Sequence, residues 1–554
     1  MAKVDYNNKN RDDYGNKRST ISNEYADPTI NLALDTIKKE KQALIFTNTK
    51  RSAEKAAEDI AAKIKPEAIA SEKTHLEQIA EKVLSSLHNP TRQCQRLSMC
   101  IKKGTAFHHA GLTQKQKEII QDEFSKGRIK IIAATPTLAA GVDLPAFRTI
   151  LKDLRRFTPT GLQFIPVLEY LQMAGRAGRP KFDSFGEAIA VAKTEQEKAR
   201  IWKKYIKGEP EEIYSKLAAE PALRFYLLSL IAGDFVRTKD EIIDFFQQTF
   251  WAHQYGNLER LEAVIDKMLM LLSDFGFIIQ KGKKGCAYDS SEADFIDAHQ
   301  INKEDNKEKY KATQIGKRVS ELYLDPLTAY SLINAEKKAD IILKNSTLVP
   351  YSFLQMIAYT LELRPLLRVK AKEYDDIMER FANYEDCIIT TKPTAFDIDY
   401  DEFLNSVKTA MLFEDWTNEK TEDVLLEEYD IRPGELKAKL DIADWLTYSS
   451  IELAKILGYK EVSKELAKIR TRLKYGVKEE LLALLKLKNI GRARARKLYK
   501  NGLKDISAVK KADITTLRTL IGARTAEGIK EQLGQKVEKA SPNKRKGQKN
   551  LEDY

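Results

Sequence analysis

Apolar and polar positions change their spacing along the chain near residue 200. Before that point, short and almost uniformly apolar segments alternate with amphipathic stretches of helical period, such as residues 50–65. The apolar segments read QALIFTN (42–48), GTAFHHA (104–110), IKIIAAT (129–135) and EAIAVA (187–192). Buried strands that alternate with helices are typical of a parallel sheet, so we predict an α/β parallel-sheet domain over residues 39–200.

After residue 200 the pattern is mostly helical. Residues 220–277 have helical period and a β-like stretch follows at 276–288, an order that predicts a winged helix over 201–325. Long amphipathic repeats predict an all-α bundle over 326–474, and two Ile-Gly pairs mark a compact helical unit over 475–535. The leader and linker at 1–38 begin with a polar segment, to about Thr20, that we expect to be loosely ordered. The basic tail at 536–554 is expected to be disordered.

Charge and cysteine content narrow the class of protein. The chain carries 93 Lys and Arg against 81 Asp and Glu, a surplus of +12 that suits either a polyanionic partner or a merely basic surface. Its four cysteines are too scattered for a disulfide framework, and Cys94 and Cys100 before His108 and His109 fit no common zinc spacing. We therefore expect no metal site in this chain. No apolar run has membrane-span length and the first residues do not form a signal peptide, so we expect a cytoplasmic protein without a membrane partner.

The most informative motif is the segment from Gln172 to Pro180, QMAGRAGRP. Its arginines, Arg176 and Arg179, lie three residues apart and place two guanidinium forks on one side. A planar fork can meet phosphate oxygens bidentately, and the glycines allow close backbone approach. A solvated Gly/Arg loop is the alternative for this segment taken by itself.

Three further segments precede this motif. ATPTLAAGVDLP (134–145) follows the strand IKIIAA, so the hydroxyls of Thr135 and Thr137 are expected at a strand's carboxyl end, where α/β sheets bind ligands. FHHAGL (107–112) and FTNTKRS (46–52) likewise contain or follow predicted strands.

Together these four segments resemble motifs IV, IVa, V and VI of superfamily 2 helicases, in order and at normal separations. The combination is similar to the Ski-type branch, and most of all to the archaeal HELQ-type DNA repair helicases. The resemblance continues through LRF (223–225), LYLDPL (322–327) and YGVKEEL (475–481), and so covers nearly the whole chain from about residue 39. It implies that residues 39–200 form the second RecA-like domain of a helicase.

The resemblance also implies roles for single residues. Arg176 and Arg179 would be arginine fingers for ATP, which are worth on the order of 10³ to 10⁵ in rate, and Gln172 would position the attacking water or the γ-phosphate. Gly141 and Asp143 would face the nucleotide, although Asp143 stands where this branch usually has Asn. The residues expected to contact DNA in this domain are Asn48, Thr49, Thr135 and Thr137.

Residues 149–166 are expected to contain a β-hairpin around Thr-Pro-Thr-Gly. In the family such a hairpin splits the duplex, and Phe157 would stack on the last base pair. Thr160 replaces the second aromatic residue that the family places at the tip. A purely structural hairpin is the alternative.

Residues 434–446 resemble the family's ratchet helix. Lys437 or Lys439 and Trp445 are about two turns apart, which we interpret as one shared face that grips single-stranded DNA. The family's arginine, seven residues before the tryptophan, is Ala438 here, so a flanking lysine would have to replace it. A tryptophan packed in the core is the alternative.

Residues 487–498 have a helix-hairpin-helix pattern in which Gly491 would permit a tight turn against a DNA phosphate. Arg492 and Arg494, with further basic residues after them, favour this interpretation over a solvated basic helix. The last residues, 548–554, resemble a shortened box for binding the sliding clamp PCNA, with one aromatic residue instead of two.

The 554 residues contain neither a G-x-x-x-x-G-K-[ST] phosphate cradle nor a DExH motif. We therefore expect a C-terminal part of an ATP-dependent 3′–5′ DNA helicase, acting on forked or single-stranded DNA in repair. ATP and Mg²⁺ would be held mainly by a missing P-loop domain on a separate chain, and this chain alone would be inactive. The alternatives are a fork-binding relic without a motor and a part of a Ski-type RNA helicase.

Overall fold

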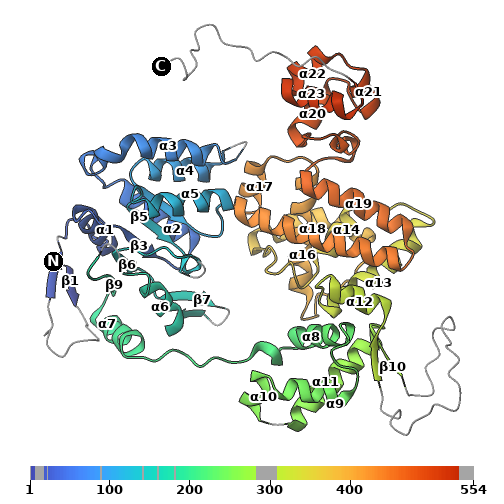
Figure 1. Cartoon of the computed structure of the whole chain (residues 1–554), viewed down its shortest axis with the longest axis horizontal. Coiled ribbons are helices and arrows are strands. Elements are labelled where there is room, and N and C mark those ends of the chain that lie inside the picture. The colour runs from blue at the N-terminus through green and yellow to red at the C-terminus, as the bar shows by residue number, and fades with distance from the viewer. Residues whose placement is uncertain are drawn as a thin grey trace. The chain divides into compact units, whose positions relative to one another are not determined.

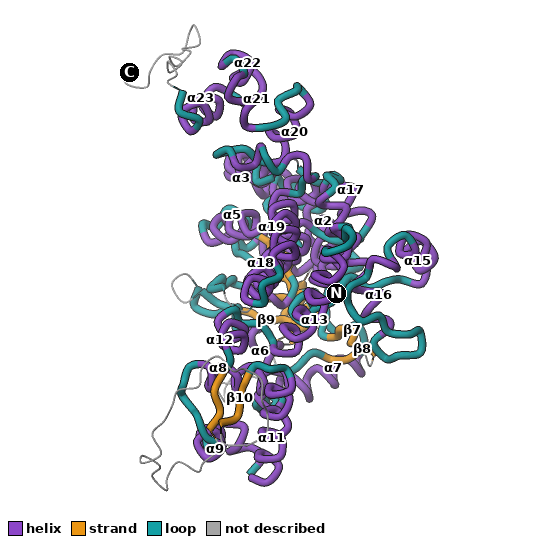
Figure 2. The backbone as a smooth tube through the Cα atoms, turned by 90° about the vertical axis from the view of Figure 1, so that its right-hand side faces the viewer, coloured by secondary structure: helices purple, strands orange, loops and turns teal. Residues whose placement is uncertain are grey.

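The computed structural model describes residues 2–5, 18–21, 23–87, 90–139, 142–158, 161–179, 183–256, 258–281 and 309–535 (Figure 1). It divides into two compact units. Unit 1 comprises Met1–Ile213 together with Glu422–Ala438, and unit 2 comprises Tyr214–Thr421 together with Lys439–Tyr554. In unit 2 the described strands are limited to one short pair, whereas unit 1 contains a central sheet (Figure 2).

Unit 1 is organised around a five-stranded parallel sheet with the order β4-β5-β3-β6-β9. The central strand pairs Ala43 with Ile131 on one side and with Arg148 on the other. β3, β4, β5 and β6 are buried along their whole length, as expected for a sheet covered on both faces. The predicted parallel sheet is therefore present, and its strands are β3 (Ala43–Phe46), β4 (Thr105–His108), β5 (Ile131–Ala134), β6 (Arg148–Leu151) and β9 (Glu187–Ala190).

Helices connect these strands and cover the sheet. α1 contacts β3 and β6, α2 contacts β4 and β5, and α4 and α5 contact β4. Several begin at a side chain that accepts a backbone N–H, such as Asp27 for α1 and Thr113 for α5, which satisfies donors that the helix itself leaves unpaired. The helices are α1 (Pro28–Lys38), α2 (Lys50–Ala61), α3 (Lys73–Leu84), α4 (Arg92–Ile101), α5 (Gln114–Ser125), α6 (Val167–Ala174) and α7 (Glu195–Ile201), with 3-10 turns at Pro66–Glu72 and Pro136–Leu138 and a π-helical turn at Trp202–Ile206.

Arg148 is a fully buried cation at the start of β6. Its guanidinium donates to Glu187 at 2.6 Å, to Asp35 at 2.9 Å and to the Thr36 hydroxyl at 2.8 Å. A buried charge is tolerated only when it is paired and hydrogen-bonded, and these partners meet that need. Arg148 thereby ties α1 to β6 and β9.

Two predictions about unit 1 need correction. The leader expected to be loosely ordered contains a short antiparallel pair, β1 (Ala2–Asp5) and β2 (Arg18–Ile21). The predicted hairpin is confirmed only for β7 (Arg155–Thr158) and β8 (Gly161–Phe164), because β6, which contains the first part of that segment, belongs to the parallel sheet. The hairpin pairs Phe157 with Leu162 along the backbone; the Phe157 side chain and residues 159–160 lie outside the described part.

Unit 2 begins with helices and a two-stranded antiparallel sheet. The order agrees with the helix-helix-hairpin pattern of the sequence, and residues 282–308 between the two strands lie outside the described part. The elements are α8 (Glu220–Ala232), α9 (Lys239–Gln247), α10 (Phe250–Tyr255), α11 (Leu258–Asp274), β10 (Ile278–Lys281), β11 (Lys309–Ala312) and α12 (Gln314–Glu321), with a 3-10 turn at Lys216–Ala218.

A helical bundle follows, in which α14 packs on α16 and both contact α19. It contains α13 (Pro326–Leu343), α14 (Pro350–Ala358), α15 (Tyr374–Ala382), α16 (Tyr400–Thr417), α18 (Pro433–Ile456) and α19 (Lys460–Tyr475), with 3-10 turns at Ala371–Glu373 and Glu385–Cys387. The division differs from the predicted all-α domain at 326–474, because α17 (Glu422–Glu428) and the start of α18 pack with unit 1.

The C-terminal helices have a hydrophobic core of their own, which includes Val477, Leu498, Leu517 and Ile529. They are α20 (Arg492–Lys500), α21 (Ile506–Lys511), α22 (Ile514–Ile521) and α23 (Ala523–Gln532), preceded by 3-10 turns at Glu479–Leu481 and Leu484–Lys486. Throughout the described residues, none of the helices combines the length and the apolar character needed to cross a membrane.

Glu336 of α13 provides a test of the packing in unit 2. It is completely buried, accepts a hydrogen bond from the Ser450 hydroxyl of α18, and burial raises its pKa to about 8. Between its ordinary value of 4.5 and about 8, the unfolded chain loses this proton while the folded protein keeps it. Stability therefore falls as pH rises through that window.

We expect Glu336→Gln to remove this dependence, because the amide is neutral at every pH. At pH 8 the free energy of unfolding should rise by on the order of a few kcal/mol, and at pH 4 the two proteins should differ little. Thermal unfolding at both pH values measures this, with Glu259→Gln on the exposed side of α11 as the control. Equal stability of wild type and Glu336→Gln at pH 8 would show that the buried carboxyl is ionised.

Candidate nucleotide and nucleic-acid site

The predicted site residues of unit 1 lie at two opposite edges of the sheet. All five strands are parallel, so Thr47 after β3, His109 after β4 and Thr135 after β5 share the carboxyl edge. Helix α6 runs back from that edge, and Arg176 after it hydrogen-bonds to Ala146, just before β6 begins. The backbones of the two groups are therefore at opposite ends of the strands, and the Arg176 side chain extends from the amino edge to Ala139, which ends the turn after β5.

Thr135 and Thr137 form one pair at the carboxyl edge. Their hydroxyl oxygens are 2.9 Å apart, with Thr135 buried and Thr137 exposed on the 3-10 turn Pro136–Leu138. The Thr135 amide donates to the His108 carbonyl at 3.2 Å, which fixes the start of the turn. The exposed hydroxyl can donate to a phosphate oxygen, as the sequence predicted for this position.

Asn48 and Thr49, at the same edge, have structural contacts. Thr49 caps α2 by accepting the Ser52 amide at 3.1 Å. The Asn48 amide donates to the carbonyl of Arg155, the first residue of β7, and so connects the end of β3 to the hairpin. A contact of either side chain with DNA remains a prediction.

Arg176 is the centre of the amino-edge group. Its guanidinium donates to the Ala139 carbonyl, with the Nε–O distance 3.1 Å, and lies 3.7 Å from the Asp143 carboxylate. The Asp143 side chain is 99% exposed, and Gln172 lies exposed in the last turn of α6. Gly141, predicted to face the nucleotide, lies outside the described residues.

Arg179 is held more firmly than Arg176. It donates to Asp183 at 2.7 Å and to the Gln42 side chain at 2.7 Å, and Lys41 contacts the same carboxylate at 2.7 Å. The hydrogen bond from Arg179 holds the pKa of Asp183 below its ordinary value. For Arg179 to contact a nucleotide, these bonds would have to be exchanged for bonds to phosphate.

The glycines of this motif allow two backbone segments to touch. Gly178 has φ +98°, a conformation that L side chains rarely adopt, and a Cβ at Gly186 would lie only 2.2 Å from the Gly178 nitrogen. The Gly178 amide donates to the Ala146 carbonyl at 2.7 Å, and the Ala146 amide to the Arg176 carbonyl at 2.9 Å. The arginine loop is thus joined directly to the segment that contains Asp143.

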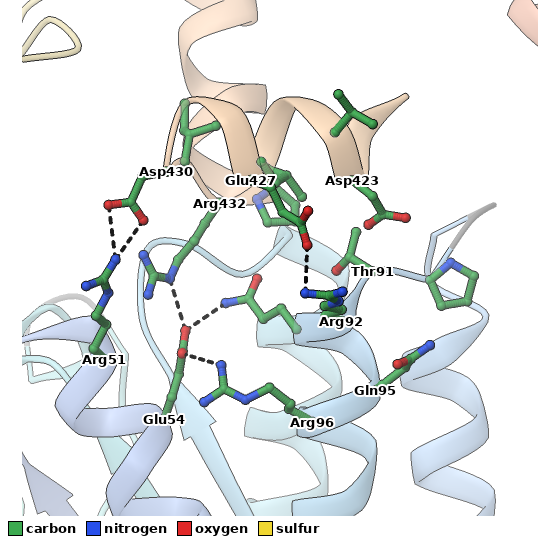
Figure 3. A pocket seen from close by; sticks show the side chains of 16 residues that line it. Arg51, Glu54, Thr91, Arg92, Gln95, Arg96, Asp423, Glu427, Asp430 and Arg432 are labelled. Atoms are coloured by element: carbon green, nitrogen blue, oxygen red, sulfur yellow. Dashed lines mark hydrogen bonds and ion pairs between the residues drawn. The ribbon is translucent and has the colours of Figure 1, made fainter. Parts of the chain in front are cut away.

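The loop after β4 surrounds a buried carboxylate that the sequence did not reveal. The Glu54 side chain is only 4% exposed and accepts hydrogen bonds from four described groups. The donors are Arg432 at 3.0 Å and Arg96 at 2.8 Å (Figure 3), together with His109 at 3.1 Å and Gln93 at 3.2 Å. Burial would raise the pKa of Glu54, but the bonds from His109 and Arg432 outweigh burial and hold the pKa far below its ordinary value.

His109 has a defined tautomer in this cluster. The Gly111 amide can only donate, and it points at Nδ1 of His109 at 3.1 Å, so Nε2 carries the proton and donates to Glu54. Burial lowers the pKa of His109, which keeps the ring neutral. The predicted motif HHAGL therefore positions Glu54, which in turn binds Arg432.

Two glycines allow the same loop to meet the start of α18. A Cβ at Gly434 would lie 2.4 Å from the Leu112 carbonyl oxygen, and one at Gly111 would lie 2.4 Å from Cδ of Arg432. The Gly434 amide donates to the Gly111 carbonyl at 3.0 Å. A larger residue at 434 would separate the two backbones, and one at 111 would displace the Arg432 side chain.

Further ion pairs surround this contact. Arg51 pairs with Asp430 at 2.8 Å and Arg92 with Glu427 at 2.7 Å (Figure 3). Lys50 pairs with Glu435. The Arg51–Asp430 and Arg92–Glu427 pairs border a cavity of about 670 Å³ between α2, α4 and α17. We call Glu54, its partners His109, Arg96 and Arg432, and these ion pairs the Glu54 clamp. Sequence reasoning missed the clamp because Glu54 and Arg432 are 378 residues apart. The adjacent glycine and proline at the start of α18 were the available local signal.

The ratchet-helix interpretation changes in one respect. Trp445 is half-buried and its Nε1 donates to the Leu322 carbonyl at 3.1 Å. Lys439 is six residues earlier, about 120° around the helix, so the two do not share a face. Its amino group donates to the Pro365 carbonyl at 2.6 Å. Lys437, which is exposed, lies about 80° from Trp445, whereas Ala438 lies within about 20°.

The first hairpin of the C-terminal unit also differs from its prediction. Gly491 has an extended backbone, and the residue with positive φ is Asn489, at +60°, so the turn does not require glycine at 491. Arg492 donates to the Lys420 carbonyl at 2.8 Å and lies over the Trp416 ring. Arg494 is exposed and donates to the Asn489 carbonyl at 2.8 Å.

The remaining predictions concern metal and the tail. In the part of the chain that the structure describes, His, Cys, Asp and Glu side chains form no group of three or more that could hold a metal ion. The proposed sliding-clamp box at 548–554 lies outside the described residues.

Three protein-family models match parts of the chain. They are the helicase conserved C-terminal domain at residues 85–181, domain 4 of archaeal helicases at 351–476, and a SAM-like helix-hairpin-helix tandem at 481–535. The first contains β4, β5, β6 and α6, and the third contains α20–α23. The predicted helicase and helix-hairpin-helix domains are thereby confirmed.

Curated relatives match over most of the chain. Proteins named ATP-dependent DNA helicase Hel308 are 35% identical in Methanocella arvoryzae, 37% in Methanococcus vannielii and 36% in Pyrococcus horikoshii. These matches cover 95%, 91% and 91% of this chain and 67%, 67% and 66% of the relatives. The chain thus spans about two thirds of their length. At this identity and coverage it belongs to the Hel308 family of archaeal DNA helicases.

Proposed function

We propose that the chain provides the second RecA-like domain and the DNA-handling helices of an ATP-dependent DNA helicase. One observation carries the proposal: a single segment, residues 135–146, connects the hydroxyl pair at the carboxyl edge of the sheet to the arginine loop at its amino edge. A motor needs such a connection between nucleotide and nucleic acid, whereas a simple binding domain does not. The names of the relatives support this choice.

The amino edge fits a γ-phosphate but not a whole nucleotide. Arg176 and Arg179 offer bidentate donors, and Gln172 is exposed beside them to orient a water molecule. The 554 residues contain no G-x-x-x-x-G-K-[ST] cradle; the nearest sequence, Gly316-Lys317-Arg318, lies in α12. The phosphates and Mg²⁺ would be held by a P-loop domain outside these residues, on the same polypeptide or another, and we expect negligible ATP hydrolysis without it.

Exchange of hydrogen-bond partners at Arg176 would couple the two edges. The guanidinium now holds the Ala139 carbonyl, and a phosphate oxygen would compete for the same donors. Ala139 is four residues from Thr135, so releasing its carbonyl would free the turn that presents the threonine hydroxyls. ATP binding would then loosen the grip of the threonine turn on the DNA backbone, and loss of phosphate would tighten it.

The other elements are assigned to the DNA path by family resemblance. The β7–β8 hairpin with Phe157 would separate the strands of a fork, and α8–α11 with β10 and β11 would form a winged helix. Trp445 of α18 would stack on single-stranded bases, and the C-terminal hairpins would bind the DNA backbone. We propose 3′–5′ movement on forked DNA in repair.

The Glu54 clamp would connect the motor to the ratchet helix. The clamp fixes Arg432 and Gly434 to the RecA-like domain, and α18 continues without a break from there to Trp445. A rotation of the RecA-like domain would therefore act on the first turn of α18. This would transmit movement to the base that Trp445 contacts.

A fork-binding protein without a motor is the second candidate. It is favoured by Arg179, whose guanidinium already has partners in Asp183 and Gln42. A part of an RNA helicase is a weaker candidate, since the helix-hairpin-helix tandem favours DNA. Reconstitution with a Hel308 P-loop domain on forked DNA distinguishes the first two, because only the motor hydrolyses ATP and separates strands.

We expect Arg176→Ala to lower DNA-stimulated ATP hydrolysis by the reconstituted protein by about 10³-fold or more, because the transition-state charge loses a guanidinium. Thermal unfolding should change little, since the side chain makes no buried ion pair. Arg128→Ala is the matched control: this arginine lies just before β5, at the same edge, and pairs with Glu123 at 2.7 Å. Full hydrolysis by Arg176→Ala would favour the fork-binding protein.

We expect Glu54→Gln to detach the start of α18, because Arg432 would lose its buried anion. Breaking such a pair by removing one partner costs about 3 kcal/mol, and amide hydrogen exchange over residues 422–438 should accelerate. Glu58→Gln is the control, one turn along α2, where the carboxylate binds Arg96 but not Arg432. Unchanged exchange in Glu54→Gln would show that the other ion pairs are enough to hold this segment.

A further inference from the structure

The turn between α12 and α13 has an unusual residue at its centre. Tyr323 has φ +59°, its amide donates to the Ser320 carbonyl at 3.1 Å, and the next amide, of Leu324, donates to the Val319 carbonyl at 3.2 Å. These bonds define the left-handed residue that ends a helix, where glycine is preferred because a Cβ is strained there. Gly276, Gly458 and Gly476 occupy the corresponding position after α11, α18 and α19.

Among the described residues, Tyr323 is the only aromatic one with positive φ. The other non-glycine residues in this conformation are Glu40, Asp234, Glu419, Asp430 and Asn489, all with acidic or amide side chains. A tyrosine at such a position indicates that its side chain has a use that outweighs the backbone strain.

The surrounding structure holds the turn rigidly. Arg224 binds both oxygens of Asp325, at 2.8 and 2.9 Å, and Asp325 caps α13. Glu362 accepts the Asp325 amide at 3.0 Å and the Thr328 hydroxyl at 2.7 Å. Leu322 and Leu324 are both buried. Tyr323 is thus presented by a fixed support.

The Tyr323 ring itself contributes little to the core. It is 74% exposed, and its aromatic neighbour Phe225 lies near-parallel, with ring centroids 6.2 Å apart. Tyr226 lies edge-on to Phe225 and is itself 53% exposed. The three rings form an aromatic surface that faces solvent.

This surface is anchored to the residue already assigned to single-stranded DNA. Nε1 of Trp445 donates to the carbonyl of Leu322, the residue immediately before Tyr323. We propose that Tyr323, backed by Phe225, is a second stacking position for a base of the strand that Trp445 contacts. The inference rests on the proposed single-strand grip of α18 and extends it by one named contact.

Stacking of a base on the Tyr323 ring explains both the exposure of the ring and the strained backbone at this residue. Every base has an aromatic face, so an exposed ring on a rigid turn can hold a strand without reading its sequence. The αL backbone directs the side chain away from the helix end and into solvent, where a glycine would offer no ring. An apolar protein segment is the other possible occupant, and the experiment below distinguishes it.

The test uses the full chain, an oligothymidylate containing one 2-aminopurine, and thermal unfolding. In Tyr323→Gly the dissociation constant should rise about tenfold and the quenching of 2-aminopurine should decrease, while the melting temperature stays equal or rises because backbone strain is relieved. Tyr323→Phe keeps the ring and should bind like the wild type.

Glu40→Gly is the matched control, because Glu40 ends α1 with the same two hydrogen bonds and φ +58°. It should gain the same backbone relief without any loss of binding. Unchanged binding and quenching in Tyr323→Gly would overturn the inference. Together with a lower melting temperature they would assign Tyr323 a structural role, and with an unchanged or higher melting temperature they would favour an apolar protein segment as the occupant.

Trp445→Ala, measured in parallel, tests the single-strand grip of α18 separately from the stacking position at Tyr323. If Trp445→Ala weakens binding and Tyr323→Gly does not, only the second stacking position is wrong. If the wild type does not bind the oligonucleotide, the single-strand grip of α18 fails together with this inference.

Discussion

Parallel pairing of all five strands is the constraint on which the arrangement of unit 1 depends. Every connection must leave a strand at the carboxyl edge and return to the amino edge before the next strand can begin. Residues 135–146 make this crossing between the threonine pair and the bridge to Ala177, and α6 makes it in front of Arg176. Strands of four residues separate the two edges by roughly 13 Å. The threonine pair and the backbone of the arginine loop are thereby kept apart, although one short covalent path joins them.

The Glu54 carboxylate applies a second constraint within the same unit. A buried anion is stable only if donors surround it, and those donors come from α2's neighbours and from the distant residue Arg432. Gly434 then removes the side-chain atoms that would hold the two backbones apart, and Gly111 leaves room for the Arg432 side chain. Electrostatics and close packing together make the beginning of α18 part of unit 1, although it lies more than two hundred residues beyond the last strand of that unit's sheet.

Sequence reasoning found the features that are local. Four strands of the sheet were identified because they are short, apolar and bounded by turns, and Thr135 lies at the carboxyl end of a strand as predicted because it directly follows β5. β6 was missed since it begins with a charged residue, Arg148, whose burial depends on partners in α1 and β9. The Glu54 clamp could not be predicted because spacing along the chain carries no information about such distant pairs. The prediction that Lys439 and Trp445 share a face was wrong for a simpler reason. They are six residues apart, which is not a whole number of helical turns.

The C-terminal hairpin shows why a basic motif need not equal a basic surface. Arg492 lies on Trp416 and Arg496 pairs with Glu419 and Glu480, so these arginines fix the hairpin to the bundle. Gly491, in contrast, has no role in the chain itself: its backbone is extended, and an added Cβ would meet nothing within 4 Å. Neither conformation nor packing explains a glycine there. We propose that an external group approaches the amides that begin α20 closely there, and a phosphate oxygen is a group that those donors fit.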